Sequence, residues 1–274
     1  MKSRRHFATA LLVAAGLLPG MPVYAGRTCE DKPLSTQMLE RSMELAAKTW
    51  EALEAQYDRN GTQVVILARM GQDLSKYRLR YSHLGMVYRT VDGDGSPAWR
   101  VLHKLNECGT AEAGVYRQGL GEFALDDLWR YEVAWAVPTP EVQARLLALI
   151  GDQPSSLKMH TKPYSMLSYP WAIRYQQSNQ WVLETIAEAM DSDVTNREQA
   201  QAWLKLKGYQ PSALEIGALT RLGARVTKAN IAFDDHPNEK RYSDHIETIT
   251  ADSLFAWLKR AGMAGTPVTL RLDK

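Results

Sequence analysis

The spacing of hydrophobic side chains predicts a long amphipathic helix near the start of the chain. Apolar residues recur every three or four positions from residue 34 to residue 57, and Asn60-Gly61 is a typical helix stop. Short apolar segments then predict strands at 64–67, 82–90, 99–105 and 131–137. Since the turn sequence Asp92-Gly93-Asp94-Gly95 separates the second and third of these, they are expected to form a hairpin.

Helical spacing returns after the fourth strand. Thr139 is placed to cap a helix that runs to about Ile150, and a second strong helix is expected over 179–190. Residues 106–130 are expected to mix short helices with loops, and 154–170 to be loop-rich. Further helices are predicted at 197–207, 212–222 and 254–261, and further strands at 229–233, 246–249 and 268–272. This mixture predicts an α+β fold.

The N-terminus has the three-part layout of a secretory signal peptide. Lys2, Arg4 and Arg5 precede an apolar run over 7–18, and small or compact residues lead to a cleavage site after Ala25. The protein is therefore expected to be periplasmic or secreted. The segment from Ser3 to Phe7 is also similar to the twin-arginine export motif, so the choice between the two export routes stays open. The predicted parts are a signal peptide (1–25), a helical segment (26–62), a core (63–190) and a C-terminal subdomain (191–274), the alternative for the last part being an extension of the same α+β layer.

Composition and charge narrow the classes of partner. The chain has 33 basic and 31 acidic residues, and removal of the signal peptide takes away three basic residues and no acidic one. A nearly neutral mature chain gives no electrostatic reason to bind nucleic acid, and no transmembrane segment is expected after cleavage. In an oxidising compartment, the two cysteines of the chain predict a disulfide between Cys29 and Cys108, the rival interpretation being a free, nucleophilic Cys108.

Three separated segments carry the residue types of an acyl-transfer site. His83 follows Tyr81-Ser82 at the start of one predicted strand, and His103 lies on the strand that returns from the hairpin turn. In such a hairpin the two imidazoles can face the same side of the sheet. Ser178 lies at the start of a predicted helix and is followed by Asn179-Gln180-Trp181.

The acidic residues and histidines near 234–245 match no metal motif, so neither a metal nor another cofactor is expected.

The order of these motifs resembles a known plan. A Ser-His-x-Gly strand, a second histidine on the next strand and a later helix that opens at a nucleophile are similar to the circularly permuted papain-like core of NlpC-type peptidases and lecithin:retinol acyltransferase-like enzymes. That resemblance covers roughly residues 64–190. At closer range, segments 71–75, 81–83, 106–110 and 178–184 resemble the exported bacterial family called domain of unknown function 2145, to which no activity is attached. The resemblance implies a permuted papain-like core with a C-terminal α/β elaboration.

The papain-like resemblance also implies roles for individual residues. His83 falls at the position of the general base, His103 at that of the group that orients it, and Ser178 at that of the catalytic cysteine. A serine at this position is a departure, because its hydroxyl is far less acidic than a thiol and needs a base during attack. Asn179, Gln180, Trp181 and Tyr81 are then expected to contact the substrate.

Two functional hypotheses follow from these roles. The leading one is hydrolysis or transfer of an acyl group in the bacterial envelope, on a peptidoglycan peptide, a lipid or a protein. The alternative is a catalytically inactive periplasmic module that binds its ligand in the same groove. A scaffold partner of an envelope complex is a third possibility. The same positions also have a purely structural interpretation, in which Ser178 only caps a helix and the histidines are buried core residues.

Overall fold

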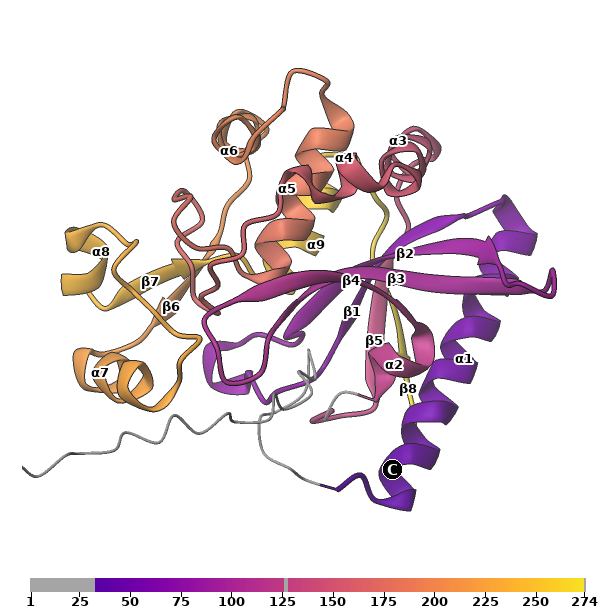
Figure 1. Ribbon diagram of the computed structural model, residues 1–274, viewed down its shortest axis with the longest axis horizontal. Coiled ribbons are helices and arrows are strands. Elements are labelled where there is room, and N and C mark those ends of the chain that lie inside the picture. The colour runs from indigo at the N-terminus through magenta and orange to yellow at the C-terminus, as the bar shows by residue number, and fades with distance from the viewer. Residues whose placement is uncertain (1–32, 126–127, 274) are drawn as a thin grey trace, which may run out of the picture.

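The computed structural model describes residues 33–125 and 128–273, and a six-stranded antiparallel sheet runs through its centre (Figure 1). The strands are β1 (Val64–Arg69), β2 (His83–Val91), β3 (Pro97–Asn106), β4 (Ala113–Gly119), β5 (Glu132–Ala136) and β8 (Val268–Arg271). Their order in the sheet is β4-β3-β2-β1-β5-β8. The α+β class predicted from the sequence is confirmed.

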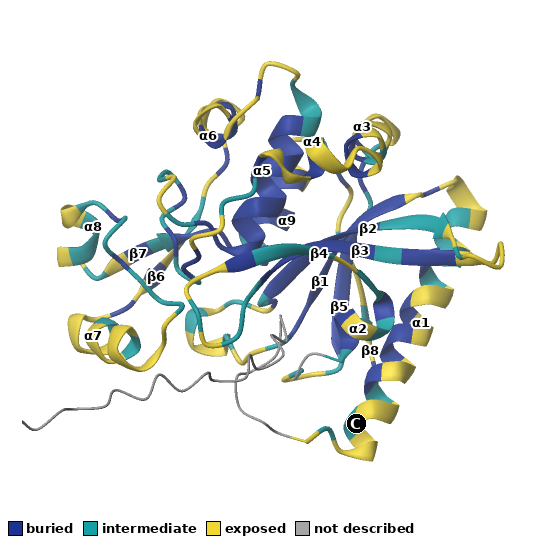
Figure 2. Cartoon of the chain, in the orientation of Figure 1, coloured by how far each residue is buried: buried dark blue, intermediate teal, exposed yellow. Residues whose placement is uncertain are grey.

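Helices cover both faces of this sheet. On one face lie α1 (Thr36–Asn60) and α2 (Leu120–Ala124). On the other lie α3 (Pro140–Gly151), α5 (Ser178–Met190), α6 (Arg197–Leu206) and α9 (Ala251–Arg260), with α4 (Gln153–Lys158) following α3. Each face has its own hydrophobic cluster, and the sheet and α5 form the most deeply buried part (Figure 2).

Alternation along the strands explains the two clusters. In β1, Val65 and Leu67 pack toward α1, whereas Val64 and Ile66 pack toward α5, because successive side chains of a strand point to opposite faces. Burial on both sides accounts for the uninterrupted apolar sequence of this strand. Among the described residues, no helix combines the length and apolar character that a membrane span requires.

The C-terminal part of the chain contributes to the same core. Strand β8 pairs with β5, and residues of α6 and α9 belong to the hydrophobic cluster of α5. Residues on both sides of position 190 therefore belong to one hydrophobic cluster. A second sheet has two strands, β6 (Ser212–Glu215) and β7 (His245–Thr248), and the chain between them forms α7 (Ala218–Thr227) and α8 (Asn238–Tyr242). A small apolar cluster at these strands also includes Tyr77, Leu79 and Leu167 from earlier in the chain.

Several elements differ from the sequence predictions. Residues 113–119 form the edge strand β4, where short helices and loops were expected. Residues 212–222 were predicted as one helix, but Gly217 caps α7 and the preceding residues pair with β7 as strand β6. The predicted strand at 229–233 is not formed. A single 3₁₀ turn, η1 (Ser75–Tyr77), lies in the loop that joins β1 to β2.

Candidate functional site

The three segments predicted to form a site do meet. Helix α5 packs against β2 and β3, and these two strands are neighbours in the sheet. The side chain of Asn179, in the first turn of α5, accepts a hydrogen bond from the backbone N–H of Leu84 at 3.0 Å. The start of α5 is thereby held against the start of β2, next to His83.

The two histidines are in direct contact. His83 Nε2 lies 3.0 Å from His103 Nδ1, and His103 Nε2 lies 2.8 Å from Oε1 of Gln118 on β4. Both rings pack against Phe123 of α2, with centroid distances of 5.9 and 5.5 Å. The expectation that the imidazoles share one side of the hairpin is confirmed. Gly85 makes room beside them, because a Cβ at this position would lie 3.4 Å from that of His103.

The hydrogen bonds assign one ring nitrogen as the available base. With the amide oxygen of Gln118 as acceptor, His103 carries its proton on Nε2 and accepts at Nδ1. His83 must then donate from Nε2, which leaves Nδ1 of His83 with a lone pair. The pair is a short relay that ends at a single basic atom.

The electrostatic surroundings keep both rings neutral. Burial, with the nearby Arg69 guanidinium as the next cause, lowers the pKa of His83 well below its usual value and that of His103 to about 3. Arg69 is itself buried: it donates to the backbone carbonyl of Phe123 and lies over that ring. No carboxylate is hydrogen-bonded to either imidazole among the described residues. A proton on His83 would therefore be poorly stabilised.

Ser178 does not share this environment. It is buried in the first turn of α5, and its hydroxyl and backbone N–H interact with the Tyr164 hydroxyl, opposing the rise that burial causes in the pKa of Tyr164. Helix α5 packs on the face of β2 that carries Leu84, whereas the histidines contact Phe123 on the other face. Gln177, not Ser178, is the N-cap residue. The structure brings the two histidines together and leaves the serine with a different partner.

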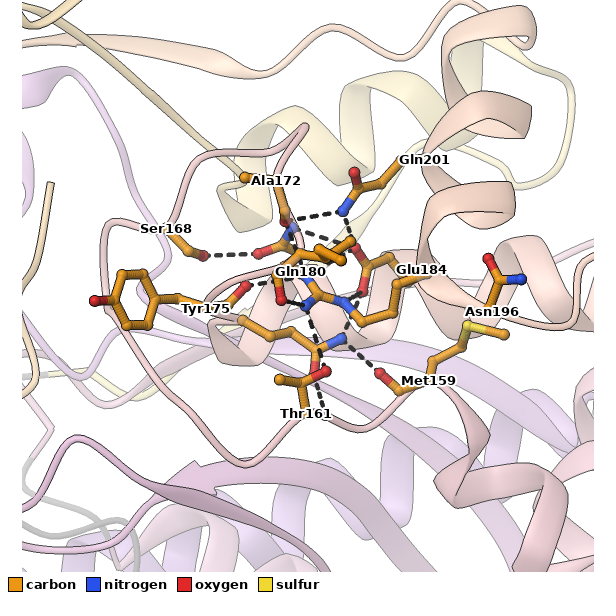
Figure 3. A network of polar contacts seen from close by, with 12 residues as sticks. Met159, Thr161, Ser168, Ala172, Tyr175, Gln180, Glu184, Asn196 and Gln201 are labelled. Carbon is orange, nitrogen blue, oxygen red and sulfur yellow. Dashed lines mark hydrogen bonds and ion pairs between the residues drawn. The ribbon is translucent and has the colours of Figure 1, made fainter. Parts of the chain in front are cut away.

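A dense polar centre surrounds the middle of α5 (Figure 3). The fully buried Glu184 carboxylate accepts from Arg197 Nε at 2.7 Å, and also from three glutamine side chains: Gln176, Gln180 and Gln201. Arg197 completes its own hydrogen bonding with the backbone carbonyls of Ala172, Ile173 and Tyr175 and the hydroxyl of Thr161. This arrangement ties α5, α6 and the loop before α5 into one unit.

Lys104 extends this centre into the sheet. Its side chain is buried beneath α5 and donates to Gln176 Oε1 at 2.7 Å and to the carbonyl of Thr161. Burial, followed by the charge of Arg197, lowers the pKa of Lys104 to about 6. Burial therefore favours the neutral amine, which serves as a hydrogen-bond donor inside the fold.

The residues predicted to contact a substrate lie inside the protein. Trp181 and Gln180 are fully buried, and Gln180 is held by Ser168 at 2.7 Å. Asn179 is used by β2, as described above, and Tyr81 donates to Glu132 at 3.1 Å while its ring meets Phe255. Asn179, Gln180 and Tyr81 thus have hydrogen-bond partners within the fold, whereas Trp181 Nε1 is buried with no hydrogen-bond partner among the described residues. All four side chains are at most 5% exposed, so they offer almost no surface to a ligand in this structure.

Sequence reasoning missed the residues that dominate this centre. Glu184 and Arg197 lie on successive helices, and charged residues in a helix usually indicate positions that face solvent. Their pairing depends on the packing of α6 against α5, which no local spacing reveals.

Within 234–245, His236 bonds Asp235 and the Glu247 carbonyl through its two ring nitrogens, at 2.9 and 2.8 Å. Cys29 and the predicted signal peptide lie outside the described residues, so the disulfide and the export signal stay predictions.

Comparison with known proteins gives a family and no activity. A model of the bacterial family described as "Uncharacterized protein conserved in bacteria (DUF2145)" matches residues 56–258, about three-quarters of the chain. No curated protein and no solved structure matches. The matched region includes the histidine pair, Ser178 and the polar centre around Glu184. The resemblance to papain-like enzymes remains a prediction from motif order.

Proposed function

This chain belongs to the uncharacterized bacterial family DUF2145, and we propose that it is a non-catalytic binding module of the bacterial envelope. One observation carries the proposal. Ser178 opens α5, which packs on the face of the sheet that carries Leu84, whereas His83 and His103 contact Phe123 on the other face. A serine nucleophile needs a base within hydrogen-bond reach of its hydroxyl, and among the described residues no hydrogen bond joins Ser178 to either histidine.

The chemistry of the histidine pair supports the same conclusion. A serine hydroxyl must lose its proton as it attacks, so the base must be stable as an imidazolium. The lowered pKa of His83 and the neighbouring Arg69 charge work against that imidazolium, and the orienting group His103 is neutral. A low pKa also weakens the base, because general-base catalysis is most efficient when the pKa lies near the working pH. The pair fits a buried, neutral hydrogen-bonded unit better than a catalytic one.

The two residues that lead into α5 and the first turn of this helix support it as well. Gln176 and Gln180 belong to the polar centre around Glu184, Asn179 holds β2, and Gln177 donates to Thr248 Oγ1 at 2.9 Å. These side chains are nearly or fully buried, so this turn acts as scaffold. Binding is then expected on the exposed surface of the protein, not in a groove at the start of α5.

A second candidate is an envelope acyl hydrolase or acyltransferase, favoured by the 3.0 Å contact between His83 and His103. In that reaction Ser178 Oγ would form a bond to the acyl carbonyl carbon as its proton passed to Nδ1 of His83. The same proton would then reach the departing amine or alcohol, and water would release the acyl group. The substrate would be an amide or ester of a peptidoglycan peptide, a lipid or a protein.

Labelling of the purified protein with a fluorophosphonate separates the two candidates. We expect no labelling that depends on Ser178, so wild type and Ser178→Ala should give equal signals. Tyr164→Phe tests whether release of the Ser178 hydroxyl uncovers reactivity, and Ser156→Ala, a buried serine of α4, is the matched control. Labelling that is lost in both Ser178→Ala and His83→Ala, at unchanged melting temperature, would overturn the non-catalytic proposal and establish the second candidate.

A further inference from the structure

Helix α7 exposes a stripe of large apolar side chains. Leu219, Leu222 and Val226 are 86%, 62% and 78% exposed. Their spacing of three and four positions puts them on one face of the helix. Tyr242 of the adjacent α8 is 81% exposed. These four residues are called the α7 patch below, and they are among the most exposed large hydrophobic residues of the described chain.

The helix gains little from the rest of the protein. None of its ten residues is buried, and its N-cap residue is Gly217, which has no side chain that could accept a capping hydrogen bond. A helix of this length is marginal in water without packing of its apolar face. A surface that covered the α7 patch would supply that missing packing.

Cations lie along α7 beside the patch. Arg221, Arg225 and Lys228 lie along or directly after α7, which contains no acidic residue. Arg221 is paired with Asp244, whereas Arg225 and Lys228 are exposed and have no ion pair within the part of the chain that the structure describes. Beside the stripe, a shallow hollow is lined by Arg221, Leu222, Arg225, Phe233, Arg241 and Tyr242. The combination is an apolar ridge with positive charge and an aromatic hydroxyl at its edge.

We infer that the α7 patch docks on the surface of an anionic lipid bilayer, an inference that rests on the proposed function as a binding module. A short helix with a projecting apolar stripe and flanking cations is suited to lie in the plane of a membrane interface. Basic side chains near anionic headgroups strengthen such binding, and tyrosine is favoured at the boundary between apolar and polar layers. The flanking charges supply the complementarity to an anionic surface.

A second copy of the chain fits the α7 patch less well. In a two-fold contact the same surface of both copies is buried, so the cations beside the α7 patch of one copy would face the equally cationic surface of the other. Like charges at such a contact oppose association. A ten-residue helix is also about 15 Å long, which is small for the face of a standard protein interface. A negatively charged, deformable lipid surface has neither restriction.

Vesicle co-sedimentation tests the inference, with protein purified from the envelope and its N-terminus verified by mass spectrometry. We expect binding to phosphatidylglycerol vesicles that falls with added salt, and much weaker binding to phosphatidylcholine vesicles. Leu219→Asp with Leu222→Asp should weaken partitioning by on the order of tenfold or more, since it removes apolar contact and adds negative charge. Arg225→Gln with Lys228→Gln should remove most of the salt dependence.

Leu206→Asp is the matched control, because Leu206 on α6 is 81% exposed and outside the α7 patch. Equal vesicle binding by the control and the Leu219/Leu222 variant, or no binding by wild type, would overturn the inference. A dimer in light scattering that these α7 variants dissolve would instead identify a second copy as the occupant. Absence of vesicle binding by the wild-type protein, together with absence of Ser178-dependent labelling, refutes this inference alone, whereas Ser178-dependent labelling refutes the proposed non-catalytic function.

Discussion

Replacement of Arg197 by methionine should destabilise the protein far more than loss of an exposed arginine. Arg197 is 7% exposed and lies 2.7 Å from the fully buried Glu184 carboxylate. Methionine removes the charge and leaves the carboxylate, together with the carbonyls of Ala172, Ile173 and Tyr175, short of a donor. Breaking a buried ion pair on one side typically costs about 3–5 kcal/mol. Total stabilities of native proteins are only about 5–15 kcal/mol, so a large part of this protein's free energy of unfolding would be lost.

The control is an arginine in an ion pair that is exposed to solvent. Arg145 lies 3.1 Å from Glu141 one turn earlier on α3, with both side chains about half exposed or more. Exposed pairs of this kind contribute about 0–1 kcal/mol, so Arg145→Met should hardly change the free energy of unfolding. Urea denaturation, followed by both fluorescence and circular dichroism, measures the two losses and checks that unfolding is two-state.

A double variant tests the reason for the loss. If the cost comes from an uncompensated carboxylate, then adding Glu184→Gln to Arg197→Met should recover part of the stability, because a neutral amide is cheaper to bury than a charge. The contact between the two residues predicts such non-additivity. The reasoning is refuted if Arg197→Met costs less than about 1 kcal/mol. It is also refuted if the losses of Glu184→Gln and Arg197→Met simply add.

Three further predictions concern buried positions in and beside the sheet. Lys104 has a pKa of about 6 in the folded protein, so above that pH the unfolded chain binds one more proton than the folded one. The free energy of unfolding should therefore rise by up to ~1.4 kcal/mol per pH unit from pH 7 to 8.5. Lys104→Met should remove this slope in denaturation curves, and an unchanged slope would contradict the assignment. His103, with a pKa of about 3, should keep a neutral ring at pH 5 by nitrogen-15 NMR, and the stability it contributes should fall as pH drops below about 6.5; an imidazolium signal at pH 5 would exclude the burial argument. Gly85→Ala should cost about 1–3 kcal/mol because its Cβ would lie 2.5 Å from Val101 Cγ1, whereas Gly151→Ala meets no atom within 4 Å and should be nearly neutral; equal melting temperatures would count against this packing.

Local signals explain what could be predicted from the sequence. The histidine contact follows from one hairpin: the register pairs Met86 with Leu102, so His83 and His103 become diagonal neighbours on the same face. The turn at 92–95 and the strand alternation are sufficient to place this pair. The long α1 likewise forms where helical spacing, a Ser35 cap and Gly61 all agree.

Longer-range pairing explains what could not be predicted. Strand β4 contains Gly114 and Arg117 and has no clear apolar alternation, and it forms because β3 supplies its hydrogen-bond partners. Strand β6 exists because β7, more than thirty residues later, pairs with it. The side of the sheet on which Ser178 lies depends on the packing of α5 against Leu84 and Met86. Motif order alone therefore predicts that the segments lie close together, but it does not determine which side chains are in contact.

The motifs that carried the family resemblance have structural explanations of their own, and these bear on function. In the segment 106–110, Asn106 donates to the carbonyls of Thr110 and Glu112 and so closes the β3–β4 turn. In the segment 178–184, the spacing from Gln180 to Glu184 places both residues in one buried hydrogen-bond network, where the glutamine amide lies 3.2 Å from the carboxylate. Polar residues buried in a sheet–helix core are costly unless every partner is present, so their pattern reflects the fold as strongly as it would a catalytic site. A resemblance built on such positions supports common architecture, and the search for function moves to the exposed surface around α7.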